Sequence, residues 1–292
     1  MKVAVYGRPI ATDDLENFIA RFTRCMETNG IEYLACASYG DFLEKEYGLK
    51  WDKTNNLDSD FDFLISLGGD GTVLDTLALV RDSGLPVLGV NLGRFGFLAT
   101  IKVEDIDSAV QQLLNNEYEV EGRSVLEVVT EIPEIQKFPY ALNDFVVQKR
   151  DSSAMISVDA YLEDDFLNSY WSDGLILATP TGSSGYSLSC GGPLLFPGSQ
   201  SMVLTPIAAH NLTVRPAVLP DNRGLHFNIS SRGNSVLVSL DSRSYKVPTN
   251  TKFEVKKADF KFNMVNLDGQ TYMDTIRTKL MWGVDKRNST NK

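Results

Sequence analysis

The chain of 292 residues contains little of what several protein classes require. It has only two histidines, His210 and His226, and no HExxH sequence, which argues against a histidine-rich metal site. Its three cysteines, Cys25, Cys36 and Cys190, lack the spacing of metal ligands and are typical of reduced residues in a cytosolic protein. No apolar run approaches the length of a membrane-spanning helix, so we expect no membrane partner.

Two common catalytic motifs are also missing. There is no G-x-x-x-x-G-K-[ST], which excludes a P-loop enzyme, and residues 182–185 lack the G-x-S-x-G spacing of a hydrolase elbow. The formal net charge of −10 argues against a nucleic-acid partner, because nucleic-acid binding faces are basic. A polyanionic substrate would therefore have to be held by local amides, metal ions and a few placed basic residues.

The first part of the chain alternates strand and helix patterns. Residues 2–6 are too short in apolar length for a signal peptide and predict a first strand. Apolar residues at Phe18, Ile19, Phe22 and Met26 have helical spacing, and Gly30 is a plausible stop for that helix. Further strands are expected at 31–37, 61–66 and 86–90, and further helices at 72–81 and 104–115. This alternation predicts a parallel sheet.

The pattern changes near residue 120, where strand-like runs begin to dominate. They cover 124–130, 144–148, 155–162, 174–178, 225–229, 235–240 and 253–255. Turn residues separate several of them, so a second domain rich in antiparallel strands is expected. Residues 272–282 return to a helical pattern. We therefore expect an α/β domain over 1–120, onto which a helix at 271–285 packs, a β-rich domain over 121–270 and a disordered tail at 286–292.

The glycine-rich stretch 67–72 carries the first chemical signal. It places Gly68, Gly69, Asp70, Gly71 and Thr72 directly after an apolar strand. Glycines let backbone amides approach an anion, and the start of a helix favours negative charge. A carboxylate in such a cradle makes sense if it binds a metal on a phosphate or takes a proton from an attacking hydroxyl. The stretch is thus typical of a small-molecule kinase, although a tight turn without function has the same residues.

The second signal is the run of hydroxyls and glycines at 179–187, which follows an apolar strand. Its hydroxyls and amides could bind a nucleotide, and Tyr186 could pack on the base or ribose. The alternative is an ordinary surface loop, against which Asp173 before the strand and the Gly191-Gly192-Pro193 sequence after it both count. His226 is expected to face outward from a strand, and His210 is equally compatible with a structural and a site-adjacent role.

Together these two stretches, in this order, resemble the NAD kinase family over nearly the whole chain. Residues 68–72 are similar to its GGDGT motif, and residues 173–193 to its long DG…TPTGSTAYS…GGP signature. Further similar segments are 91–98, 141–144, 209–216 and 279–283. The GGDG sequence is weak alone, because lipid kinases and phosphofructokinases have similar turns. The 179–187 run and the closing KLMWG sequence make the resemblance specific.

The resemblance implies a Rossmann-like α/β domain, a β-sandwich-like domain, ATP and NAD⁺ as substrates, and Mg²⁺. It also implies a cytoplasmic homodimer or homotetramer. Asp70 would be the catalytic carboxylate near the adenosine 2′-hydroxyl. The other residues implied to line the nucleotide site are Gly69, Gly71, Thr72, Phe97, Asn143, Asp144, Asp173, Thr181, Ser184, Gly185, Tyr186, Ser189 and Ala208. Among these, Asp173 and Ala208 would face the nicotinamide end.

Three departures from the family pattern stand out. Asp144 occupies a position where Glu is usual, and Ser184-Gly185 replaces Thr-Ala. Arg243 replaces a usual Gln and could add positive charge near the site or be surface. Two other functions remain open from sequence: a lipid-type kinase that shares the glycine turn, and a catalytically silent NAD-binding regulator. The first would need an apolar pocket for an acyl chain, and no unexplained apolar stretch supplies one.

Overall fold

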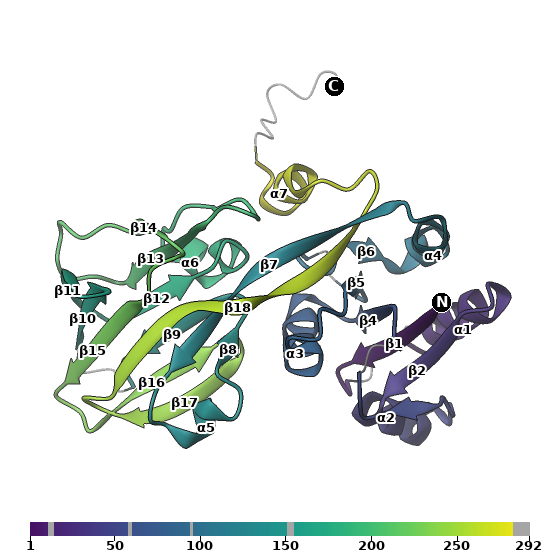
Figure 1. Cartoon of the computed structure of the whole chain (residues 1–292), viewed down its shortest axis with the longest axis horizontal. Coiled ribbons are helices and arrows are strands. Elements are labelled where there is room, and N and C mark those ends of the chain that lie inside the picture. The colour runs from purple at the N-terminus through teal and green to yellow at the C-terminus, as the bar shows by residue number, and fades with distance from the viewer. Residues whose placement is uncertain (11–14, 58–59, 94–95, 151–154, 283–292) are drawn as a thin grey trace. The chain divides into compact units, whose positions relative to one another are not determined.

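The computed structural model describes residues 1–10, 15–57, 60–93, 96–150 and 155–282, and they form two compact units. The terminal unit comprises Met1–Glu121 and Asn263–Lys292, and the middle unit comprises Gly122–Phe262. The chain passes between them within two strands, β7 (Tyr118–Val129) and β18 (Lys252–Leu267) (Figure 1). The tail expected at 286–292 lies outside the described residues.

The terminal unit is built on the predicted parallel sheet. Its strands run in the order β5-β4-β1-β2-β3, and every neighbouring pair is parallel. Figure 1 shows β5, β4, β1 and β2 side by side. The strands are β1 (Lys2–Gly7), β2 (Glu32–Cys36), β3 (Lys53–Thr54), β4 (Phe63–Leu67), β5 (Val87–Asn91) and β6 (Ile101–Lys102), the last of which pairs with β5. Every residue of β4 and β5 is buried, as expected of strands covered on both faces.

The helices of this unit are α1 (Leu15–Thr28), α2 (Ala37–Tyr47), α3 (Asp70–Val80), α4 (Ile106–Asn115) and α7 (Tyr272–Leu280), with a 3-10 turn at Val103–Asp105. In α1 the predicted apolar face is buried, and Gly30 takes the left-handed conformation (φ 62°) just beyond its end. Helix α2 was not predicted, because Gly40 interrupts its interior. That glycine lets the helix approach Lys53 closely, since a Cβ there would lie 2.9 Å from the lysine Cγ.

The middle unit consists of two antiparallel layers. One has the order β11-β10-β15-β18, and the other β14-β13-β12-β9-β16-β17. The strands are β8 (Tyr140–Ala141), β9 (Asp144–Gln148), β10 (Ile156–Leu162), β11 (Asp165–Ser172), β12 (Gly174–Ala178), β13 (Ser201–Ile207), β14 (Ala217–Pro220), β15 (Leu225–Ser231), β16 (Ser235–Leu240) and β17 (Arg243–Pro248). The short helices are α5 (Pro133–Gln136), η2 (Gly182–Ser184) and α6 (Tyr186–Ser189).

The core of the middle unit lies between these two layers. The ring of Phe145 on β9 lies 5.7 Å from that of Phe227 on β15 and 5.3 Å from that of Phe253 on β18. Along β15 and β16, buried and less buried residues alternate, so each strand contributes one face to this core. The predicted fold class, an α/β part followed by a sandwich-like β part, is therefore confirmed. No helix among the described residues is long and apolar enough to cross a membrane.

Candidate functional site

The glycine turn of the terminal unit joins β4 to α3. Gly68 donates its N–H to the carbonyl oxygen of Val90 at 2.9 Å, which fastens the turn to the neighbouring strand. The φ of Gly68 is 155°, and a Cβ there would lie 2.2 Å from Oγ1 of Thr72, so only glycine fits. Helix α3 begins at Asp70, two residues earlier than predicted. The first turn of this helix, where backbone N–H groups can face an anion, therefore belongs to the motif itself.

The carboxylate of Asp70 is held by three consecutive backbone N–H groups. Phe97 donates to Oδ2 at 2.8 Å, while Leu98 and Ala99 donate to Oδ1 at 2.9 and 3.0 Å. Gly96 lies so close that a Cβ there would come within 1.8 Å of Oδ1. A carboxylate has about four lone-pair positions, and donors from the described residues fill three of them, which leaves one position on Oδ2. The turn at 96–99 thus fixes the acid and leaves it able to accept one more hydrogen.

A cavity of about 440 Å³ lies at the carboxyl ends of the parallel strands, where α/β proteins bind their ligands. Gly69, Gly71 and Thr72 line it, as does Arg8. A second cavity of about 600 Å³ shares Leu15, Asn91, Leu92 and Gly93 with the first. The predicted phosphate-side residues therefore border a hollow of suitable size for part of a nucleotide.

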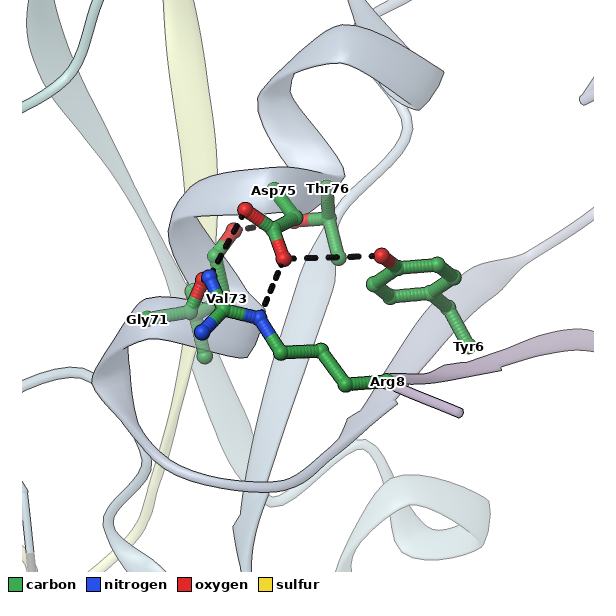
Figure 2. A network of polar contacts seen from close by, with 6 residues as sticks. All are labelled: Tyr6, Arg8, Gly71, Val73, Asp75 and Thr76. Carbon is green, nitrogen blue, oxygen red and sulfur yellow. Dashed lines mark hydrogen bonds and ion pairs between the residues drawn. The ribbon is translucent and has the colours of Figure 1, made fainter. Parts of the chain in front are cut away.

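Arg8 is a residue of this site that the sequence analysis missed. Figure 2 shows its guanidinium between Asp75 and the first turn of α3. Nε and Nη2 donate to the two carboxylate oxygens of Asp75 at 2.6 and 3.0 Å, and Nη2 also donates to the carbonyl oxygen of Gly71 at 2.9 Å. The hydrogen bonds that Arg8 donates to Asp75 raise the pKa of Arg8 further above its usual value. A basic residue directly after the first strand was the available signal.

In the middle unit, Asn143 and Asp144 lie at the start of β9 and are organised by Asp241. This carboxylate accepts the backbone N–H groups of Leu142 (2.9 Å), Asn143 (2.7 Å) and Asp144 (3.3 Å). The N–H of Asp241 donates in return to the carbonyl oxygen of Asp144 at 3.1 Å. Asp241 occupies the turn between β16 and β17 with φ 52°. The sequence analysis gave Asp241 no role.

Asp144 is buried, with 7% of its surface exposed. Burial and the neighbouring carboxylate of Asp241 raise the pKa of Asp144 to about 7. Burial likewise raises the pKa of Asp241, although its three backbone hydrogen bonds oppose that shift. The protonation of Asp144 therefore changes near neutral pH.

The hydroxyl-rich loop, residues 179–187, packs directly on residues 142–143. Thr179 donates its hydroxyl to the carbonyl oxygen of Leu142 at 2.6 Å and its N–H to that of Asn143 at 2.9 Å. A Cβ at Gly182 would lie 2.0 Å from the carbonyl oxygen of Asn143, so the two segments touch there. Thr181 is buried, and its carbonyl oxygen accepts from Ser184 Oγ at 3.1 Å.

Apart from the buried Thr181, the predicted ligand-facing residues of the loop are accessible. Gly185, Tyr186 and Ser189 are exposed, and Ser184 is half-buried. The hydroxyl of Tyr186 accepts a hydrogen bond from Nε2 of Gln148 at 2.7 Å, which orients its ring. The structure thus brings the loop and the residue pair at the start of β9 into one site within the middle unit.

Asp173 and Ala208 lie at adjacent points of the same sheet, because Gly174 pairs with Ile207. Asp173 forms an ion pair with Lys149 at 2.7 Å, and Ala208 is exposed with φ 47°. His210 is exposed two residues further along, and its N–H donates to the carbonyl oxygen of Trp171 at 2.9 Å. His226 is half-buried between two buried neighbours on β15.

Arg243 has a structural role. It donates hydrogen bonds to the carbonyl oxygens of Phe138 and Tyr140, and its guanidinium lies 4.6 Å from the centre of the Phe138 ring. Its guanidinium is therefore engaged in contacts with β8 and the segment before it. Within the described part of the chain, no group of three or more His, Cys, Asp or Glu residues could hold a metal ion.

Comparisons with known proteins agree with this geometry. Residues 37–118 match the ATP-NAD kinase N-terminal domain, and residues 142–267 match the ATP-NAD kinase C-terminal domain. A protein of Flavobacterium psychrophilum named NAD kinase is 42% identical over 99% of this chain and 100% of its own length. One of Bacteroides fragilis with the same name is 38% identical over 98% of this chain and 100% of its own length.

Two solved structures share the fold. Yeast NADH kinase complexed with NADH superimposes with a TM-score of 0.86 at 20% identity, covering 99% of this chain and 89% of the other. An NAD kinase from Archaeoglobus fulgidus in complex with ATP gives a TM-score of 0.73 at 24% identity, covering 96% of this chain and 99% of the other.

The pKa of Asp144 predicts how stability depends on pH. Because the folded-state pKa is about 7, above the value of about 3.9 in an unfolded chain, the folded protein holds this proton more tightly. The resulting stabilisation is complete below the unfolded value and is lost as pH rises through 7. We expect Asp144→Asn to remove this dependence, so that wild type loses stability relative to the variant between about pH 5 and about pH 8. Chemical denaturation at both pH values measures it.

Asp159→Asn serves as the control, since it removes a carboxylate from β10 of the same unit that accepts from Ser169 Oγ. An equal difference between wild type and Asp144→Asn at both pH values would contradict the assignment.

The close approach of Gly96 to Asp70 predicts a large effect of one methyl group. Gly96→Ala must displace the carboxylate or the turn, and we expect it to lower the free energy of unfolding by about 2 kcal/mol or more, the scale of one hydrogen bond to a charged group. Gly224→Ala is the matched control, because its Cβ would meet the nearest atom at 3.7 Å; a change within about 1 kcal/mol is expected. Urea unfolding of both variants measures the difference, and equal stabilities would refute the steric argument.

Proposed function

Because this chain belongs to the NAD kinase family, we propose that it transfers the γ-phosphoryl group of ATP to the adenosine 2′-hydroxyl of NAD⁺. The products are NADP⁺ and ADP. The observation that carries this proposal is the carboxylate of Asp70, which three backbone amides fix within a glycine turn whose other residues line a cavity. Such a group suits the activation of a hydroxyl for attack on phosphate.

In the proposed mechanism, Asp70 accepts the 2′-hydroxyl proton at the remaining lone-pair position of Oδ2. The ribose oxygen then bonds to the γ-phosphorus, and the bond from that phosphorus to the bridging oxygen of ADP breaks. Most of the catalysis comes from in-line positioning and charge neutralisation, and a placed base adds typically about 10²–10⁴-fold. The three amides support this role because they prevent the carboxylate from turning away.

The substrates are assigned to the two units as follows. Gly69, Gly71 and Thr72 face the phosphates of ATP, and Phe97 contributes to the adenosine pocket. In the middle unit, Asn143 and Asp144 bind adenosine. Tyr186 and its neighbours Thr181, Ser184, Gly185 and Ser189 contact the dinucleotide, while Asp173 and Ala208 face the nicotinamide end. The accessibility of Gly185, Tyr186 and Ser189 supports this assignment.

Mg²⁺ fits this site as a partner of ATP. The described residues offer no cluster of metal ligands, and Mg²⁺ is commonly held by one or two carboxylates together with substrate phosphates. Because the remaining position of Asp70 is assigned to the 2′-hydroxyl, the ion would be held chiefly by the phosphates of ATP. When bound, the ion would neutralise charge on the phosphates.

We further propose that the enzyme is cytoplasmic and a homodimer or homotetramer. The unpaired state of Cys25, Cys36 and Cys190 supports a reducing compartment. The family resemblance supports the assembly, and light scattering of the purified protein tests it.

The central test is a coupled assay of Asp70→Asn. The protein is incubated with ATP, Mg²⁺ and NAD⁺, and an NADP-specific dehydrogenase reports the product. We expect the variant to lose at least about 100-fold in kcat, because the base is gone, while it still binds NAD⁺ in a calorimetric titration. Asp107→Asn removes a carboxylate of α4 that forms an ion pair with Arg21 of α1, and this control variant should keep its activity.

Near-normal turnover of Asp70→Asn would show that this residue is not the base. Absence of turnover in wild type would instead favour the catalytically silent NAD-binding regulator. Matches to NAD kinases over the full chain do not favour the lipid-type kinase.

A further inference from the structure

Arg8 is placed beside the glycine turn by the register of the sheet. Strands β1 and β4 are parallel neighbours, and Gly7 pairs with Leu67, so the chain reaches Arg8 where the other strand reaches Gly68. Both residues thus lie at the carboxyl edge of the sheet, where the cavity of about 440 Å³ is found. Arg8 is the one charged residue among the described residues that line this cavity.

The guanidinium of Arg8 is oriented before any ligand arrives. Asp75, one helical turn beyond Gly71 on α3, accepts from both Nε and Nη2 in a two-pronged pair, and Gly71 accepts from Nη2 as well (Figure 2). A bidentate pair of this kind fixes the plane of the guanidinium. The Tyr6 hydroxyl lies 3.5 Å from Oδ2 of Asp75 and borders the same network.

This arrangement leaves part of the guanidinium available. The hydrogen bonds of Arg8 to described residues use Nε and Nη2, which leaves the two N–H groups of Nη1 unused. A Cβ at Gly71 would lie 3.2 Å from Nη1, so this nitrogen is next to the backbone of the glycine turn. The side chain is 38% exposed, which allows a ligand to reach it.

We propose that Arg8 binds the triphosphate of ATP, with Asp75 as the residue that aims it. The inference rests on the proposed position of the phosphates at Gly69, Gly71 and Thr72. In a protein with a net charge of −10, a polyanion needs local positive charge, and this cavity offers one cation together with the amides of a helix N-terminus. Glycine at position 71 leaves room for the guanidinium and the phosphate on the same side of the turn.

The test compares steady-state constants of Arg8→Gln, Arg8→Lys and Asp75→Asn with those of wild type. Because Arg8→Gln removes a charge-assisted contact to phosphate, its KM for ATP should rise at least about tenfold, while the KM for NAD⁺ changes less than about twofold. Inorganic tripolyphosphate, used as an inhibitor competitive with ATP, should lose affinity by a similar factor. Asp75→Asn keeps the cation and should raise the KM for ATP less than Arg8→Gln does.

Lys53→Gln is the matched control. Lys53 is likewise a cation paired with acidic side chains, those of Asp41 and Glu44, but it lies outside the cavity, so both KM values should stay as in wild type. An unchanged KM for ATP in Arg8→Gln would overturn the inference. Equal rises in both KM values would do so too, because they would show that Arg8 only holds the turn together.

Two further variants keep the result decisive. If Arg8→Gln does not fold, Arg8→Lys is the deciding variant. It retains the charge without the two-pronged pair, so the KM for ATP should rise while the KM for NAD⁺ does not. If the KM for ATP does not rise selectively, the inference is overturned. Thr72→Val separates this inference from the placement of the phosphates. If Thr72→Val weakens tripolyphosphate binding while Arg8→Gln does not, only the role of Arg8 fails. If neither variant does, the phosphates bind elsewhere.

Discussion

The hydrogen bonds between the Asp70 carboxylate and the backbone amides of 97–99 are the interaction on which the terminal site depends. They join the turn after β4 to the segment between β5 and β6, so two loops at the same edge of the sheet are hydrogen-bonded to each other. The glycine turn can then present its amides to an anion while its acid stays fixed. Without this link, the cavity would be bordered by two independent loops.

The middle unit also contains a carboxylate that accepts three consecutive backbone N–H groups, but there it positions the start of a strand. Asp241 accepts the amides of three consecutive residues, 142–144, and so sets the start of β9 in place. In both units a carboxylate reaches across from a distant part of the chain to capture a run of backbone donors. The two acids differ in their surroundings: Asp70 retains a position for a ligand, whereas Asp241 is half-buried and raises the pKa of the neighbouring Asp144.

The sequence analysis predicted most central elements because their apolar residues follow a clear period. The buried strands β4 and β5 and the alternating strands β15 and β16 are of this kind. It missed the edge strands β11, β14 and β17, whose residues are mostly half-buried or exposed. It also missed β13, a buried strand inside the second sheet, because Pro206 interrupts its apolar run. It also missed Arg8 and Asp241, because their partners lie 63 and 97–99 residues away in the chain. The motif residues could be identified from their neighbours in the sequence, but the residues that hold them in place, such as Asp241, could not.

Three glycines described above have no side chain to offer the chemistry, yet each touches a group that the site needs. A methyl group at Gly68, Gly96 or Gly182 would collide with Thr72 Oγ1, Asp70 Oδ1 or the Asn143 carbonyl oxygen, at 2.2, 1.8 and 2.0 Å. The positions at which a substitution impairs this enzyme are therefore more numerous than the residues whose side chains take part in the reaction. Loss-of-function substitutions in a random library should concentrate at such silent positions as strongly as at the acids themselves, because the shape of the backbone is itself part of the active site.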